Sequence, residues 1–160
     1  MCLPYIDVLF GIEPYHLWKD EQDHQTGDVK DGVPFQPDFK QQDEVFHGFV
    51  KRYPNIKCIA RHVRYAHSCS ENSLMAYLWY DGKTYESQKL RFHILDRVGG
   101  GDAFVSGIIY ALMNEYKPQD IADFGVAESA VKHTIHGDGN ITDDVSLIEH
   151  IMQMNFDIKR

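Results

Sequence analysis

Residues 96–102, whose sequence is Asp-Arg-Val-Gly-Gly-Gly-Asp, combine the residue types in this chain that are best suited to chemistry. Three consecutive glycines let the backbone approach a ligand closely and turn several N–H groups into one space. The apolar run before them predicts a strand (90–95), and the run after them predicts a helix (102–116) whose positive end points to the same place. Asp102 is suited to taking a proton from a hydroxyl while the amides hold phosphoryl charge. The pattern therefore indicates phosphoryl transfer to an alcohol.

A structural role for the same aspartate stays open at the level of sequence. An aspartate near the start of a helix commonly accepts hydrogen bonds from unpaired backbone N–H groups, so Asp102 could cap the helix. The segment matches neither the phosphate loop that ends in Gly-Lys-Ser/Thr nor the Gly-x-Gly-x-x-Gly dinucleotide fingerprint. Spacing alone leaves the catalytic and the capping interpretations equally open.

A second segment, residues 132–138 with the sequence Lys-His-Thr-Ile-His-Gly-Asp, follows about one helix later. Together the two segments resemble the C-terminal signature of the ribokinase-like carbohydrate kinases, and their form is similar to that of bacterial 2-keto-3-deoxygluconate kinases. The resemblance extends over most of the chain and is strongest over residues 91–140. It implies an α/β fold: a partial ribokinase-like, Rossmann-like layered core with a mostly parallel sheet, one hairpin and flanking helices.

The resemblance also implies roles for the glycine-rich segment. By position in the family motif, Asp102 is the general base that activates the sugar hydroxyl. The amides of Gly99, Gly100 and Gly101 form the anion hole for the transferred phosphoryl group. The implied reaction is transfer of the ATP γ-phosphoryl group to a hydroxyl of a sugar acid, 2-keto-3-deoxygluconate. Mg²⁺ would accompany the nucleotide, as in phosphoryl transfer generally.

Residues elsewhere are expected on the nucleotide side by the same resemblance. In the family, the segment after the strand at 56–60 lies along the nucleotide, so Arg61 and Arg64 are candidate phosphate contacts, with surface cations as the alternative.

The loop after the helix at 119–135 borders the nucleotide in the family, which makes His136, Gly137 and Asn140 candidate nucleotide-binding residues. His133 and His136 lack the partners and spacing of a zinc site, so no metal-binding site is expected there.

The chain departs from the family in two ways. Family members are roughly twice this length, and the missing half would carry most of the residues that contact the sugar. The family also has an Asn-x-x-Glu motif where this chain reads Ile-Glu-Pro-Tyr at 12–15, and that motif bears on metal and phosphate handling. A kinase for another sugar therefore remains an alternative, as does a catalytically incomplete remnant that acts as a nucleotide-binding or interaction module.

Truncation of such a fold would expose a sheet edge and apolar faces. We therefore expect self-association or a complementary N-terminal chain as a partner.

Apolar runs and turn signals predict the remaining elements. Residues 5–10 predict a buried strand, and residues 44–53 predict a helix. Asp81-Gly82 between two alternating runs is a strong hairpin signal. Residues 19–44 are polar and acidic, so we expect a long surface loop there, and residues 61–64 with 68–73 are expected to form a polar connection. A last helix is expected around Val145 to Met152, with Asp143 and Asp144 suited to its first turn.

Composition limits the class of protein. A chain of 160 residues with 43% hydrophobic residues fits one globular domain. A net charge of −8 argues against general binding to nucleic acids or anionic membranes. The apolar run 3–12 is too short to span a bilayer and has no basic flank, which favours a cytoplasmic protein. The cysteines are odd in number and are expected to be free thiols: Cys2, Cys58 and Cys69.

Overall fold

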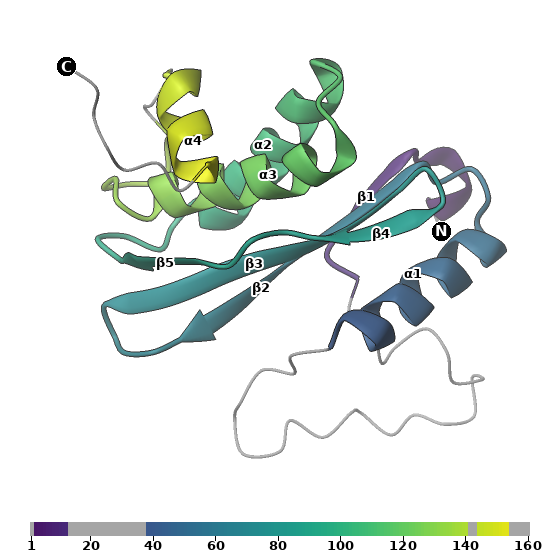
Figure 1. The fold of residues 1–160 in the computed structure, drawn as a ribbon, viewed down its shortest axis with the longest axis horizontal. Helices are drawn as coiled ribbons and strands as arrows, with labels where there is room; N and C mark the ends of the chain where they lie inside the picture. Colours follow the sequence, from purple (N-terminus) through teal and green to yellow (C-terminus); the bar gives the residue numbers. More distant parts are fainter. Residues whose placement is uncertain (1, 13–37, 141–143, 154–160) are drawn as a thin grey trace.

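The fold is a five-stranded sheet with helices on both faces (Figure 1). The computed structural model describes residues 2–12, 38–140 and 144–153. In chain order its elements are η1 (Leu3–Tyr5), β1 (Val8–Phe10), α1 (Phe39–Arg52), β2 (Cys58–Ala66), β3 (Glu71–Tyr80), β4 (Lys83–Glu86), β5 (Leu90–His93), α2 (Gly100–Met113), α3 (Pro118–Lys132) and α4 (Val145–Met152). Helices α2 and α3 cover one face, α4 packs on the outer side of α3, and α1 covers the other face.

The strands run in the order β1-β2-β3-β4, and β5 pairs with β3 beside β4. The α/β fold class is as expected, but the expectation of a mostly parallel sheet is wrong for the described strands. Only β1 and β2 are parallel, while β3 is antiparallel to β2, β4 and β5. The physical reason is connection length: parallel neighbours need a long crossover, and only the connection that contains α1 provides one between strands paired in this sheet.

The polar connection expected around residues 61–64 is instead the middle of a long strand. Nine residue pairs join β2 to β3, from Cys58 opposite Tyr80 to Ala66 opposite Asn72. The strand continues through its polar residues because each one pairs with a partner on β3, which is buried on both faces. The sheet therefore has a second, longer hairpin besides the expected one at Asp81.

Helix boundaries also differ from the sequence expectations. Helix α1 begins at Phe39, because the carboxylate of Asp38 accepts a hydrogen bond from the N–H of Gln41 at 2.8 Å. The acidic loop expected at 19–44 is thus helical from Phe39 onward, and residues 19–37 lie outside the described residues. Asp144 caps α4 as an N-cap residue, whereas Asp143 lies outside the described residues.

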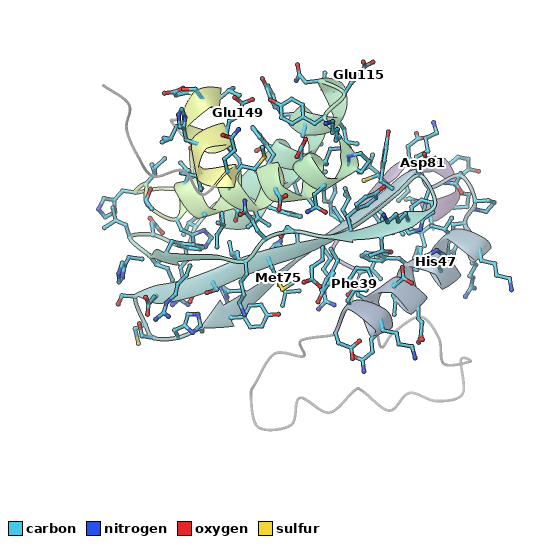
Figure 2. All side chains as sticks on the ribbon, viewed as in Figure 1. Phe39, His47, Met75, Asp81, Glu115 and Glu149 are labelled. Carbon is cyan, nitrogen blue, oxygen red and sulfur yellow. The ribbon has the colours of Figure 1, made fainter. Side chains whose placement is uncertain are left out.

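Each face of the sheet has its own core. Alternate residues of β2 point in opposite directions, so Cys58 and Ala60 pack beneath α2–α4, whereas Ile59 and Val63 pack beneath α1. Figure 2 shows Met75 on the α1 side of the sheet, where it is buried. All three cysteines are free thiols as expected, and burial raises the pKa of Cys58 to about 12. No helix within the described ranges is both long and apolar enough to cross a bilayer.

Glycines let α2 and α3 pack closely. A Cβ atom at Gly125 would lie 2.6 Å from Cδ1 of Ile108 and 3.1 Å from the ring of Phe104. A Cβ atom at Gly107 would lie 2.9 Å from Cβ of Glu128. The close approach at Gly107 is therefore made to α3, which holds the start of α2 in place over the sheet.

We predict that Gly125→Ala lowers the free energy of unfolding by about 1–3 kcal/mol, because the added methyl group overpacks the contact with Ile108. Urea denaturation monitored by circular dichroism measures the change. Gly139→Ala is the matched control, since nothing lies within 4 Å of its added Cβ. Equal midpoints for the two variants would contradict the packing argument.

Candidate functional site

The glycine-rich segment forms a turn between β5 and α2. Gly99 is the N-cap residue of α2 and has a left-handed backbone, with φ of 77°. Ala103 donates its N–H to the carbonyl of Gly99 at 2.9 Å, and the helix proceeds from there. The N–H groups of Gly101 and Asp102 lie in the first turn of α2, where no carbonyl of the helix can accept a hydrogen bond from them. They therefore point out of the helix end. A cluster of backbone donors therefore lies at the positive end of α2.

The three glycines are required for different reasons. A Cβ atom at Gly99 would overlap the carbonyl oxygen of Asp138, and one at Gly100 would overlap the ring of His133. A Cβ atom at Gly101 would meet nothing within 4 Å. Packing therefore requires the first two glycines, whereas Gly101 faces open space.

A cavity of about 340 Å³ opens beside this turn. Its described lining includes five basic side chains and no carboxylate, and the full set of lining residues is Arg61, His62, Val63, Arg64, Leu74, Arg97, Gly100, Gly101 and His133. The structure thus brings the predicted arginines together with two of the three predicted glycines. A site that gathers cations and free amides in an acidic protein is suited to an anionic ligand.

The two arginines of β2 are held differently. The guanidinium of Arg61 donates to Oε1 of Gln42 in α1 at 2.8 Å, which draws it toward the α1 side of the sheet. Strand alternation places Arg64 on the opposite face, the one that carries α2, where its side chain is exposed. Arg64 is therefore the better placed of the two to contact a ligand beside the glycine turn.

Sequence reasoning missed three residues of the cavity. Arg97 lies inside the motif itself and donates to the carbonyl of Cys69 at the tip of the β2–β3 hairpin, at 3.0 Å. His62 was not predicted because residues 61–64 were expected to form a polar connection. The alternation of side chains along β2 is the signal that could have located it. His133 lies in the second motif, but neither the resemblance nor the spacing predicts a role for it.

The two histidines are biased toward their neutral forms. His62 is exposed by surface area, but the protein atoms around its ring, whose centroid lies 4.9 Å from that of Phe104, still desolvate it; this desolvation, followed by the positive charges of His133 and the neighbouring arginines, lowers the pKa of His62. Burial also lowers the pKa of His133, although the Ser129 carbonyl, 2.7 Å from its Nδ1, opposes the shift. The ring of His133 packs directly against Gly100 and so supports the glycine turn.

Residues 132–138 form the second wall of the turn. The carbonyl of His133 accepts hydrogen bonds from the N–H groups of Leu95 and Asp96, at 2.8 and 3.1 Å. The carboxylate of Asp96 accepts from the N–H of Val98 at 3.0 Å and from the N–H of Gly137 at 2.9 Å. The two motifs are thus neighbours in space, and each satisfies backbone groups of the other.

Of the loop residues predicted to bind the nucleotide, two belong to this second wall and Asn140 follows it. Gly137 is held beside the turn by Asp96, and His136 is exposed next to it. The amide of Asn140 donates to Glu128 of α3. None of the three is among the described residues that line the cationic cavity, and only Gly137 makes a hydrogen bond to the glycine-rich segment.

Asp102 is exposed on the first turn of α2. The N-cap position belongs to Gly99, and no N–H group of a described residue donates to the Asp102 carboxylate within hydrogen-bond range. The capping interpretation therefore finds no support, and the carboxylate is left available at the same helix end as the unpaired amides.

The fold identifies the class of protein that this chain resembles. No family model matches the chain. Its fold, however, is that of the ribokinase-like carbohydrate kinases, as a solved PfkB family carbohydrate kinase from Listeria grayi shows with a TM-score of 0.72 and 26% identity, over 92% of this chain and 42% of that one. The resemblance inferred from the two motifs is confirmed.

Particular relatives are sugar-acid kinases. The structure of 2-dehydro-3-deoxygluconokinase from Thermotoga maritima matches with a TM-score of 0.76 and 25% identity, over 95% of this chain and 43% of that one. A 5-dehydro-2-deoxygluconokinase from Clostridium botulinum is 31% identical over 71 residues, which are 44% of this chain and 20% of that protein. The chain therefore spans less than half the length of the proteins that it matches.

We predict that the contact between Asp96 and the second wall makes stability depend on pH. Hydrogen bonds from the N–H groups of Val98, Gly137 and Arg97, and then the charge of Lys132, hold the pKa of Asp96 below its ordinary 3.8. The ionised carboxylate stabilises the fold above pH 4, and this contribution is lost as the pH falls through the lowered value.

Asp96→Asn should therefore unfold more easily than the wild type near neutral pH, and the difference should shrink below about pH 4. Urea denaturation at a series of pH values measures it. Asp81→Asn, in the hairpin turn, is the control. A constant difference between Asp96→Asn and the wild type at every pH would contradict the prediction.

Proposed function

We propose that this chain forms the phosphoryl-transfer portion of a 2-keto-3-deoxygluconate kinase, which transfers the γ-phosphoryl group of ATP to a hydroxyl of the sugar acid. The single observation that carries the proposal is the convergence of unpaired amides, an available carboxylate and basic side chains at the start of α2. The substrate is argued from the sugar-acid kinases that match the chain.

The amides of the glycine turn would hold the transferred phosphoryl group. Donors fixed before the reaction stabilise the charge that develops on the phosphoryl oxygens at no cost of reorganisation. Arg64 and Arg97 would add positive charge on the cavity side. Asp102 would accept the proton of the attacking hydroxyl, a role that needs a carboxylate not already engaged in capping.

Mg²⁺ fits this site only as a companion of the nucleotide. The described residues contain no group of three or more His, Cys, Asp or Glu side chains placed to hold a metal ion. Mg²⁺ in kinase sites is commonly held by substrate phosphates, water and one or two carboxylates, so a dedicated cage is not required. When bound, Mg²⁺ would neutralise phosphate charge. The chain's own residues would still bind and orient the phosphoryl group and deprotonate the attacking hydroxyl.

A nucleotide-binding or interaction module without catalysis is the second candidate. It is favoured by the short span of the match, since the chain covers only 43% of the Thermotoga maritima enzyme. In this case ATP would bind but no sugar acid would be phosphorylated. Self-association or a complementary N-terminal chain would be the route by which the first candidate obtains the rest of a kinase.

We predict that Asp102→Asn abolishes turnover while nucleotide binding persists, because the amide cannot accept the hydroxyl proton. The measurement is ADP production with Mg-ATP and 2-keto-3-deoxygluconate, and the expected loss is roughly 10²–10⁴-fold. Asp120→Asn is the matched control, since Asp120 lies in the first turn of α3 as Asp102 does in α2. Equal rates for the two variants would exclude Asp102 as the base, and binding without any wild-type turnover would favour the second candidate.

We predict that Gly101→Ala changes stability and affinity in opposite directions. Alanine is a better helix former than glycine, and no atom lies within 4 Å of the added Cβ, so stability should rise by about 0.5–1 kcal/mol. The methyl group would crowd a phosphoryl group beside the helix end, so Mg-ATP should bind roughly tenfold more weakly. Titration calorimetry and urea denaturation measure the two effects. Unchanged affinity would show that the phosphate does not approach Gly101.

A further inference from the structure

Lys132 is a buried cation for which the proposed chemistry has no direct use. It is the last residue of α3, and its side chain is fully buried. The ammonium group donates to the carbonyl of Ile135 at 3.1 Å and to the carbonyl of Gly137 at 2.6 Å. No ion pair joins it to another described residue. The ammonium group is thus hydrogen-bonded to main-chain oxygens.

Burying such a group is costly, which argues that the charge itself matters. An ammonium loses its hydration when it is buried, and two carbonyl partners restore only part of that free energy. A leucine or methionine would fill a similar volume with no such cost. Packing alone therefore does not account for a lysine at this position.

The position of Lys132 couples the two walls of the site. Its Cε atom lies 3.1 Å from the place of a Cβ atom on Gly99, so the stem packs directly against the glycine turn. Its ammonium holds the carbonyl of Gly137, while the N–H of the same residue is held by Asp96 on the other wall. The charge of Lys132 also helps to lower the pKa of Asp96, after the hydrogen bonds from Val98 and Gly137.

We propose that Lys132 is a positioning residue for the anion hole. Its ammonium fixes the loop of residues 135–137 against the glycine turn, and this contact orients the amides of Gly101 and Asp102 for an incoming phosphoryl group. The fixed positive charge directly behind the turn adds to the potential that attracts the anion. The identity of the anion, the phosphate chain of Mg-ATP, rests on the proposed function.

The carbonyl arrangement supplies a specific test, because it binds the ammonium group and not the rest of the lysine. Lys132→Ala removes the side chain and leaves space in which a free methylammonium ion can meet the same carbonyl oxygens. Sodium chloride at equal ionic strength controls for screening. Lys132→Met keeps the stem and removes only the charge, and it serves if the alanine variant does not fold.

The control for lost stability is Ile121→Ala. Ile121 is a buried residue at the opposite end of α3, so its truncation weakens the helix packing without touching either wall. We expect Mg-ATP to bind Lys132→Met at least roughly tenfold more weakly than the wild type, and to bind Ile121→Ala with nearly wild-type affinity. Methylammonium should restore the affinity of Lys132→Ala, and sodium should not. Unchanged affinity in Lys132→Met, or an equal loss in Ile121→Ala, would overturn the proposal.

A second readout separates this inference from the proposed function. If the wild-type chain does not bind Mg-ATP, the proposed function fails, and the positioning role is judged by hydrogen exchange of residues 95–101. Faster exchange in Lys132→Met than in Ile121→Ala, slowed again by methylammonium in Lys132→Ala, would support it. Equal exchange in the two single variants would overturn it.

Discussion

Two irregular segments provide hydrogen-bond partners for each other's backbone groups, and the rest of this structure depends on that constraint. Backbone groups outside helices and strands lack the partners of regular structure, and here residues 94–99 and 133–138 provide them for each other. The carbonyl of His133 and the carboxylate of Asp96 make the connection, and the ammonium of Lys132 holds the carbonyl of Gly137 within the second segment. Because α2 begins where this connection ends, the direction of its unpaired amides is set by residues more than thirty positions later in the chain.

The long β2–β3 hairpin places positive charge beside the glycine turn. It extends the sheet beyond the point where a short strand would have stopped, so that His62 and Arg64 lie beside the glycine turn. Its tip contacts Arg97 through the carbonyl of Cys69. A chain with a net charge of −8 thereby concentrates basic groups around one cavity. Local placement, and not overall charge, makes the site suitable for an anion.

The elements that the sequence predicted well are those whose signal is local. The glycine turn between a strand and a helix, the hairpin at Asp81 and the apolar faces of α2, α3 and α4 each follow from adjacent residues. The family resemblance, and no periodicity, predicted Arg61 and Arg64 as phosphate contacts; both line the cavity beside the turn, and their contact with a nucleotide stays a prediction. The start of α1 was missed because its cap, Asp38, lies within a run of acidic and turn-forming residues that conceals it.

The sequence by itself determined that a run of glycines and an aspartate would open a helix, because the backbone freedom of glycine and the position of Asp102 are properties of neighbouring residues. Only the tertiary structure decided that Gly99 and Gly100 are required by packing against Asp138 and His133, while Gly101 faces open space. It also decided that Lys132 lies beneath the turn. These contacts join residues that are distant in sequence, and their energies depend on burial and on distances that no local pattern encodes.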